Sequence, residues 1–227
     1  MTLTELFTSI ADAIRTKKGT TDKINATDFP DEIINLPSGG GGELKITSGY
    51  YLFAYEHRLD YMDEIITLLD NITNANYMFY YCQKNLTVAP SFDTSNVETM
   101  NNMFSTTNKL TTIPEYDMGK VNNVENMLRN TYALQNVGGF KDLGKAYTQT
   151  TSNYGVYKLG FYTSGSVVLT YESLMNVINK LYDLNLTYDV ANGGTLYTQS
   201  LVLGSKNLAL LTAEEIAIAT NKGWNVS

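Results

Sequence analysis

Few residues of this sequence can carry out acid–base, nucleophilic or metal chemistry. Its 227 residues include one histidine, His57, and one cysteine, Cys82. A Ser-His-Asp or Cys-His site needs a whole constellation around its histidine, and a zinc site needs more ligands than these two residues supply. We therefore interpret His57 as an ordinary surface or structural residue and Cys82 as a small buried one. A single cysteine excludes a disulfide within the chain. We predict a protein that is not an enzyme and uses no cofactor or metal.

Charged residues are also scarce, and no basic patch is present. They make up 17% of the chain, the net charge is −7, and Lys17-Lys18 is the only adjacent basic pair. Phosphate-binding surfaces need clustered lysines and arginines, so we predict no nucleic-acid partner. No apolar run approaches the roughly 20 residues that span a bilayer, and the first residues lack a secretory signal pattern. The protein is expected to be made in the cytoplasm without a signal peptide and not to insert into a membrane.

A glycine run marks a domain boundary. Pro37 and Ser38 are followed by four glycines, which a packed element does not tolerate because each forfeits backbone entropy. We predict a linker over residues 37–43. The segment before it, 1–36, has helical apolar spacing and is predicted to be a small helical attachment module. The segment after it, 44–227, is predicted to be one domain.

The domain contains an internal repeat. Asp93 to Phe104, with the sequence DTSNVETMNNMF, aligns without gaps to DMGKVNNVENML, which starts at Asp117, 24 residues later. The segment LTVAPSF from Leu86 likewise aligns with LTTIPEY and then with LQNVGGF. An earlier copy of the first half spans 72–79 and is offset by one extra residue. A period of 24 lies within the leucine-rich-repeat range of about 20–29 residues.

Each repeat has two halves. Val97, Met100, Met103 and Phe104 follow a helical spacing, so we predict a short helix with a capping box at Ser95. The half containing Pro90 is predicted to be extended, because proline is excluded from helix interiors. Since one such unit cannot bury its apolar face alone, copies are expected to stack. The predicted fold class is α/β, a leucine-rich-repeat solenoid of short parallel strands and short helices.

The flanking segments are predicted to continue the same architecture. Residues 50–55 suit a strand, and a helix follows with Met62 and Ile65 on its buried side. From about 141 to 227 we predict C-terminal capping units: strands at 167–169 and 201–203, a helix over 171–184, and a last helix capped by Thr212 with Glu215.

Several segments resemble one known family. The strings FDTSNVETMNNMF and KLTTIPEYD are similar to the DTSNVTNMxxMF repeats of BspA-like bacterial leucine-rich-repeat surface proteins, and YMFYYCQKNLT resembles their MFxxCxxLT segment. The C-terminal segment LVLGSKNLALLTAEEIAIATNKGWNVS resembles the terminal segment of such proteins encoded in phage and prophage genomes, and the start LTELFTSIADAIRTKKGTTDKINATDFPDEI resembles the opening of tail-associated proteins from phages of Gram-positive bacteria. The resemblance implies a leucine-rich-repeat fold and a binding role. The second repeat departs from the pattern, with Met118-Gly119-Lys120 in place of Thr-Ser-Asn.

Candidate partner-binding residues follow from the repeat. In leucine-rich repeats, the side chains beside the inward strand residue face the concave side; here they are Val88, Pro90, Thr112, Pro114, Asn136 and Gly138. Tyr80 and Tyr81 belong to a tyrosine-rich stretch that suits either an adaptable recognition surface or half-buried packing along the sheet. Both readings stay open. Because Asp93 and Asp117 recur with the repeat, they are predicted to form turns or caps.

These observations predict a binding or structural protein. The favoured interpretation is a phage or prophage virion protein, associated with the tail, whose repeats meet a protein or glycan of the host cell envelope. Residues 1–36 would then attach it to other virion proteins. The alternative is a bacterial cell-surface adhesin or host-interaction protein. A wall hydrolase would need an acid, a base and a nucleophile that the sequence does not bring together.

Overall fold

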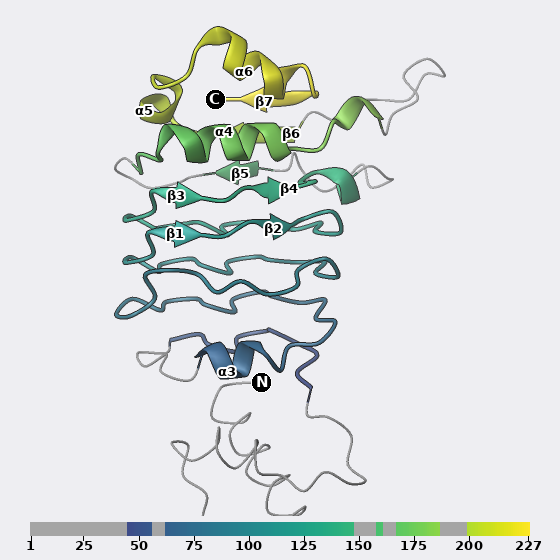
Figure 1. The fold of residues 1–227 in the computed structure, drawn as a ribbon, viewed down its shortest axis with the longest axis vertical. Coiled ribbons are helices and arrows are strands. Elements are labelled where there is room, and N and C mark those ends of the chain that lie inside the picture. Colours follow the sequence, from purple (N-terminus) through teal and green to yellow (C-terminus); the bar gives the residue numbers. More distant parts are fainter. Residues whose placement is uncertain (1–44, 56–61, 148–157, 161–166, 187–198) are drawn as a thin grey trace, which may run out of the picture.

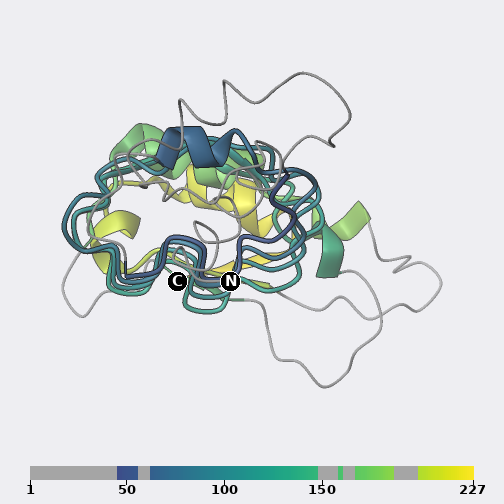
Figure 2. The ribbon, with the colours of Figure 1, turned by 90° about the horizontal axis from the view of Figure 1, so that it is seen from below.

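The chain winds into stacked coils whose backbones follow one another closely. The computed structural model describes residues 45–55, 62–147, 158–160, 167–186 and 199–227. The predicted attachment module, the glycine linker and His57 lie outside these residues. Figure 1 shows the coils lying one above another, and the view along the stack in Figure 2 shows their outlines nearly superimposed. We call each complete winding a coil.

Successive coils are joined by parallel backbone pairing in the register of the repeat. Isolated bridges pair Asn74 with Thr99, Thr99 with Asn123, and Val88 with Thr112. The strands β1 (Thr112–Ile113) and β3 (Asn136–Val137) pair in parallel, as do β2 (Tyr116–Asp117) and β4 (Phe140–Lys141). Most backbone hydrogen bonds therefore run between coils rather than within them.

The core is a set of columns in which each coil places the same kind of side chain over the next. Phe53, Phe79 and Phe104 stack with centroids 5.2 and 5.4 Å apart and nearly parallel ring planes, and all three are buried. Tyr116 continues this stack at 6.3 Å from Phe104. The predicted core positions Met100, Met103, Phe104 and Met127 are confirmed as buried.

The predicted helices over the first half of each repeat are wrong. Residues 97–104 and 121–128 form bridges and tight turns. Instead of bonding along a helix, the amide of Met100 donates to the carbonyl of Asn123, and that of Asn102 donates to Glu125. The capping box predicted at Ser95 is also wrong, because the Glu98 amide, which it requires, donates to the Thr73 carbonyl of the preceding coil at 2.8 Å. The strand predicted at 50–55 is likewise a run of turns.

Side-chain acceptors explain where these turns begin. The Asn74 and Asn123 side-chain oxygens accept the amides two residues later, at 2.9 Å each, and Ser48 does the same for Tyr50. Short polar side chains favour such local turns over helix. In the coil between Asn74 and Asn123, the Asn101 amide instead donates to the Asn76 side chain of the preceding coil at 2.7 Å.

The predictions for the flanks are mostly confirmed. Helix α3 (Met62–Ile66) precedes the repeats, and α4 (Tyr171–Lys180) follows them, with Thr170 accepting the Ser173 amide at its N-terminus. The last helix, α6 (Ala213–Thr220), has the predicted Thr212–Glu215 capping box. Residues 167–169 are not a strand.

The C-terminal unit continues the stack with longer elements. A parallel sheet has the order β5-β6-β7, formed by β5 (Lys158–Gly160), β6 (Gln199–Val202) and β7 (Trp224–Val226). Short helical segments η2 (Lys145–Tyr147), η3 (Leu184–Leu186) and α5 (Ser205–Leu208) complete it. Among the described residues, no helix has the length and apolar character that a bilayer crossing requires.

The C-terminal end of α4 is held by a lysine from the chain terminus. The Lys222 ammonium donates to the carbonyls of Ile178, Asn179 and Leu181 at 2.7–3.3 Å. Partial burial lowers the pKa of Lys222. The Trp224 indole N–H donates to the Tyr182 carbonyl at 2.9 Å. These contacts fix the last strand against α4, so the end of the stack is covered.

Candidate recognition surfaces

Three of the predicted partner-binding residues form one surface strip. Val88 bridges Thr112, and Thr112 pairs with Asn136, so the three side chains follow one another across three coils. Val88 is 55% exposed, Thr112 is half-buried and Asn136 is exposed, while Ile113 and Val137 beside them are buried. The side chains of the strip are small and uncharged. It offers shape and hydrogen bonds, not charge.

The other predicted triplet serves the packing between coils. Pro90 is buried, and its carbonyl accepts a hydrogen bond of 2.8 Å from the Tyr116 hydroxyl. Pro114 and Gly138 are half-buried, and a Cβ on Gly138 would lie 2.5 Å from the Glu115 nitrogen. Pro90 therefore does not belong to a solvent-facing surface. Burial also raises the pKa of Tyr116.

Tyr80 and Tyr81 lie in a second, aromatic surface. Their rings belong to a connected set of ring contacts that includes four further tyrosines from the first two coils, with centroids 4.5–6.4 Å apart. We call this set the tyrosine cluster: Tyr50, Tyr51, Tyr55, Tyr77, Tyr80 and Tyr81. Tyr55 is 53% exposed, Tyr50 43% and Tyr81 37%, and the other members are half-buried. The cluster is the largest gathering of aromatic rings among the described surface residues.

The stacking of the coils places these tyrosines over one another. The amide of Tyr51 donates to the Asn76 carbonyl, and that of Tyr55 to the Tyr80 carbonyl, at 3.1 and 2.8 Å. Tyr51 consequently lies over Tyr77, with ring centroids 4.5 Å apart and planes 11° from parallel. Tyr55 lies over Tyr81 at 5.4 Å. The rings are held by the backbone register of the fold.

Four of these tyrosines have a backbone conformation that is unusual for an aromatic residue. Tyr51, Tyr55, Tyr77 and Tyr81 have φ angles of 56–63°, in the left-handed region. In the turn from Ala75 to Met78, closed by the Met78 amide, Tyr77 is the third residue, where glycine or asparagine is usual. A bulky residue there costs about 1–3 kcal/mol.

The next two coils occupy the same positions with less costly residues. Asn102 and Asn126 correspond to Tyr51 and Tyr77, and their φ angles are both 55°. At the position of Tyr55 and Tyr81 the later coils have Thr106 and Asn130, with φ angles of 63° and 61°. Asparagine tolerates this conformation well. The four tyrosines are therefore not required by the turn.

The tyrosine cluster is uncharged at neutral pH. Desolvation, followed by the neighbouring Tyr77, Tyr50 and Tyr55, raises the pKa of Tyr51, and the pKa of Tyr55 is raised in the same way by desolvation and Tyr80. Charged side chains enter the corresponding columns only at the fourth coil, with Glu125 and Arg129. The cluster thus combines ring faces, hydroxyl groups and neutral neighbours.

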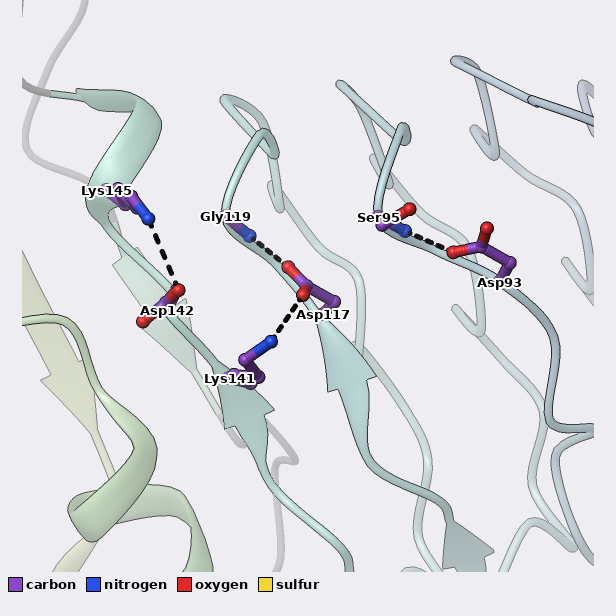
Figure 3. Close-up of polar contacts among 7 residues, drawn as sticks. All are labelled: Asp93, Ser95, Asp117, Gly119, Lys141, Asp142 and Lys145. Atoms are coloured by element: carbon purple, nitrogen blue, oxygen red, sulfur yellow. Dashed lines mark hydrogen bonds and ion pairs between the residues drawn. The ribbon is translucent and has the colours of Figure 1, made fainter.

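The recurring aspartates form the turn that we predicted for them. Asp93 accepts the Ser95 amide at 2.9 Å, and Asp117 accepts the Gly119 amide at 3.0 Å (Figure 3). Asp117 also pairs with Lys141 of the next coil at 2.8 Å. The Ser95 amide lowers the pKa of Asp93. Partial burial raises the pKa of Asp117, but the hydrogen bonds from Lys141 and Gly119 lower it by more. The pKa of Asp117 therefore lies below its ordinary value. Asp93 and Asp117 therefore have a structural role in these turns.

Cys82 and Glu215 have structural hydrogen-bond partners. Cys82 is fully buried, as predicted, and its thiol donates to the Phe53 carbonyl at 2.9 Å. No group of three or more histidine, cysteine, aspartate or glutamate side chains within the described ranges is placed to hold a metal ion. The Glu215 carboxylate accepts the Thr212 amide in the capping box.

Comparison with known proteins gives one family. Residues 61–154 match a family model described as "Mycoplasma protein of unknown function, DUF285". This family is related to BspA-like leucine-rich-repeat surface proteins, so the resemblance of the repeats is supported at that level. The matched span contains the repeats and part of the tyrosine cluster. No curated protein and no solved structure is similar enough to the chain to count as a match.

Sequence reasoning missed the left-handed positions. The signal for them was present in Asn102 and Asn126, which lie 24 residues apart in adjacent coils and each precede a buried methionine. Because tyrosine occupies those positions in the first two coils, the pattern is hidden unless the coils are aligned one by one. Only Tyr80 and Tyr81 were selected from the cluster.

Proposed function

We propose that residues 44–227 are a non-enzymatic recognition domain of the leucine-rich-repeat solenoid type. The observation that carries this proposal is the tyrosine cluster, in which four aromatic residues adopt left-handed backbone angles that the later coils assign to asparagine or threonine. Strain kept at an exposed surface is typical of functional sites. Tyrosines with neutral polar neighbours are typical of binding surfaces. The proposal assigns no catalytic residue, cofactor or metal.

The setting that we propose is a phage or prophage virion, with the chain associated with the tail. Residues 3–33 resemble the opening of phage tail-associated proteins, residues 201–227 resemble the terminal segment of repeat proteins encoded in phage and prophage genomes, and the repeats would be presented to a host cell envelope. In that role residues 1–36 bind other virion proteins. Antibodies against the chain should then label assembled particles, and deletion of residues 1–42 should remove the label while the repeats stay folded.

A bacterial surface adhesin is the second candidate. It is favoured by the match to a family related to bacterial surface proteins. Antibodies should in that case label the surface of the producing cells in the absence of particles. A direct test for both candidates is binding of the fluorescent full chain to intact bacterial cells and to cultured animal cells. Finding the chain on neither particles nor cell surfaces, with no binding to any cell, would overturn the recognition role.

A further inference from the structure

The tyrosine cluster restricts the kind of ligand that it can accept. The coil stacked on it contributes Asn101, Asn102, Ser105 and Thr106, so the aromatic surface continues into amides and hydroxyl groups without a charged side chain. The chain as a whole carries a net charge of −7. A polyanion such as a nucleic acid would be repelled by this net charge, and in the described columns beside the cluster the first basic side chain is Arg129 of the fourth coil. The ligand that fits this surface is therefore neutral.

The ring geometry also excludes an aromatic cage for a cation. Tyr50 and Tyr77 are nearly perpendicular, at 89°, but their centroids are only 6.4 Å apart, and Tyr77 and Tyr80 are at 80° and 5.5 Å. Rings at these distances touch one another, edge against face. An ammonium group enclosed between two rings needs room against both of them. The rings instead form a continuous ridge with outward faces and edges.

We propose that this ridge binds an uncharged carbohydrate chain. The inference rests on the proposed recognition role and names the partner chemistry for it. A pyranose ring has one face of polarised C–H groups, which packs on the electron-rich face of a tyrosine, and a rim of hydroxyl groups, which the tyrosine hydroxyls and neighbouring amides bind. Tyr51 and Tyr77 cover each other's facing sides, so the exposed members Tyr50, Tyr55 and Tyr81 offer the ring surfaces and hydroxyl groups along the ridge.

Preorganisation explains why tyrosine is kept in a left-handed turn. Each contact with a neutral sugar is weak, so affinity depends on avoiding the entropy of ordering the binding surface. The backbone bonds between coils hold Tyr55 and Tyr81 before any ligand arrives. An asparagine at these positions would satisfy the turn, as Asn130 does, but it would remove the ring.

The test is a substitution copied from the protein itself. In the full chain, the double variant Tyr55→Asn and Tyr81→Asn introduces the residue that occupies the same turn position at Asn130. We expect its melting temperature to equal or exceed that of the unaltered protein. Tyr132→Asn is the matched control, because Tyr132 is 47% exposed and outside the cluster.

The probes are cellohexaose and chitohexaose, two uncharged hexasaccharides, with hexagalacturonate as an anionic chain of equal length. Binding is measured by calorimetry and by chemical shifts of labelled tyrosine rings, with buried Trp224 as an internal reference. We expect saturable binding of at least one neutral chain with a dissociation constant of about 1 mM or below, weakened about tenfold or more in the double variant. Tyr132→Asn should bind normally, and hexagalacturonate should bind more weakly than the neutral chains.

Several results would overturn the inference. They are the absence of saturable binding by either neutral chain, unchanged affinity in the folded double variant, or tighter binding of hexagalacturonate. If the double variant fails to fold, Tyr50→Ala takes its place, because Tyr50 is exposed and has no left-handed angle. If the double variant still binds cells while sugars do not bind, the recognition role stands and only the carbohydrate ridge is wrong.

Discussion

At the scale of single residues, the repeat conserves hydrogen-bond roles more closely than residue types. The Cys82 thiol donates to the Phe53 carbonyl at 2.9 Å, and one coil later the Thr107 hydroxyl donates to the Phe79 carbonyl at 2.8 Å. Both donors are fully buried. A buried carbonyl without a donor costs free energy, so this position requires a donor of small volume.

The first prediction tests this requirement. Replacing Cys82 with threonine should leave the free energy of unfolding nearly unchanged, because Thr107 shows that the site accepts a hydroxyl. Thr107→Val should lose about 1–3 kcal/mol, since it leaves the Phe79 carbonyl unpaired. Cys82→Val should lose less, because a thiol is the weaker donor. Urea unfolding followed by circular dichroism measures all three, and a large loss in Cys82→Thr would contradict the shared role.

A second residue-scale prediction concerns acid stability. The folded pKa of Asp117 lies below its ordinary value of 3.8. The ionised carboxylate therefore stabilises the fold at neutral pH, and this contribution is lost as the pH falls below 3.8 and through the folded pKa. Asp117→Asn keeps the turn acceptor for Gly119 but loses the charge that pairs with Lys141.

We expect the asparagine variant to be less stable than the unaltered protein at pH 7, and we expect the difference to shrink as the pH falls below 3.8 and the carboxylate becomes protonated. Thermal unfolding over this pH range measures the difference. Lys141→Gln serves as the control, because it removes the other partner of the ion pair. It should therefore reduce the same acid-dependent loss of stability. A difference that stays constant across the acid range would show that the ion pair contributes nothing.

At the scale of elements, the sequence correctly predicted the proline-containing half of the repeat and the Thr212 cap, whereas the strands predicted at 50–55 and 167–169 are wrong. The segment from Leu110 to Pro114 was expected to be extended. Strand β1 lies there, because proline excludes a helix and the Ile113 side chain is buried in the core. The capping box at Thr212 was also read correctly, because its bonds are local. Interactions within a few residues can be recognised from one sequence.

The helices predicted at 97–104 and 121–128 are wrong because the deciding interactions are not local. Buried residues at Val97, Met100, Met103 and Phe104 match helical spacing, but a row of tight turns whose amides bond to the next coil buries the same positions. Apolar spacing cannot distinguish the two when the deciding hydrogen bonds are made between coils. The tyrosine cluster was found only in part for the same reason.

An element-scale prediction follows from the close contact between β1 and β3. A Cβ on Gly138 would lie 2.5 Å from the Glu115 nitrogen and 2.8 Å from the Pro114 carbonyl carbon, both backbone atoms that cannot turn aside. Gly138→Ala should therefore destabilise the protein by about 1–3 kcal/mol.

Gly119→Ala is its control, because the nearest atom there is an Asp117 side-chain oxygen at 3.2 Å, which can move. Its loss should be clearly smaller in the same denaturant titration. Equal losses in the two variants would mean that the coils separate more easily at this point than their contact distance indicates.

At the scale of the whole molecule, stability passes from each coil to the next. Phe79, Phe104 and Tyr116 form a continuous buried stack, and backbone amides donate to carbonyls of the preceding and the following coil. In stacked repeats of this kind, stability is approximately a sum of unit terms and nearest-neighbour interfaces. Damage to one coil should therefore spread to its neighbours first.

Phe104→Ala tests this nearest-neighbour behaviour. Removing a fully buried ring should cost about 3–5 kcal/mol. Hydrogen exchange should accelerate at the amides of Phe79 and Thr106, which bond across the affected interfaces, while the Ser227 amide, which donates to Leu201 in the C-terminal sheet, keeps its protection. The control is Leu201→Ala, also fully buried, which should reverse the pattern by loosening the C-terminal sheet and sparing the coils. Uniform acceleration along the whole chain in both variants would show instead that coils and C-terminal sheet unfold as a single cooperative unit.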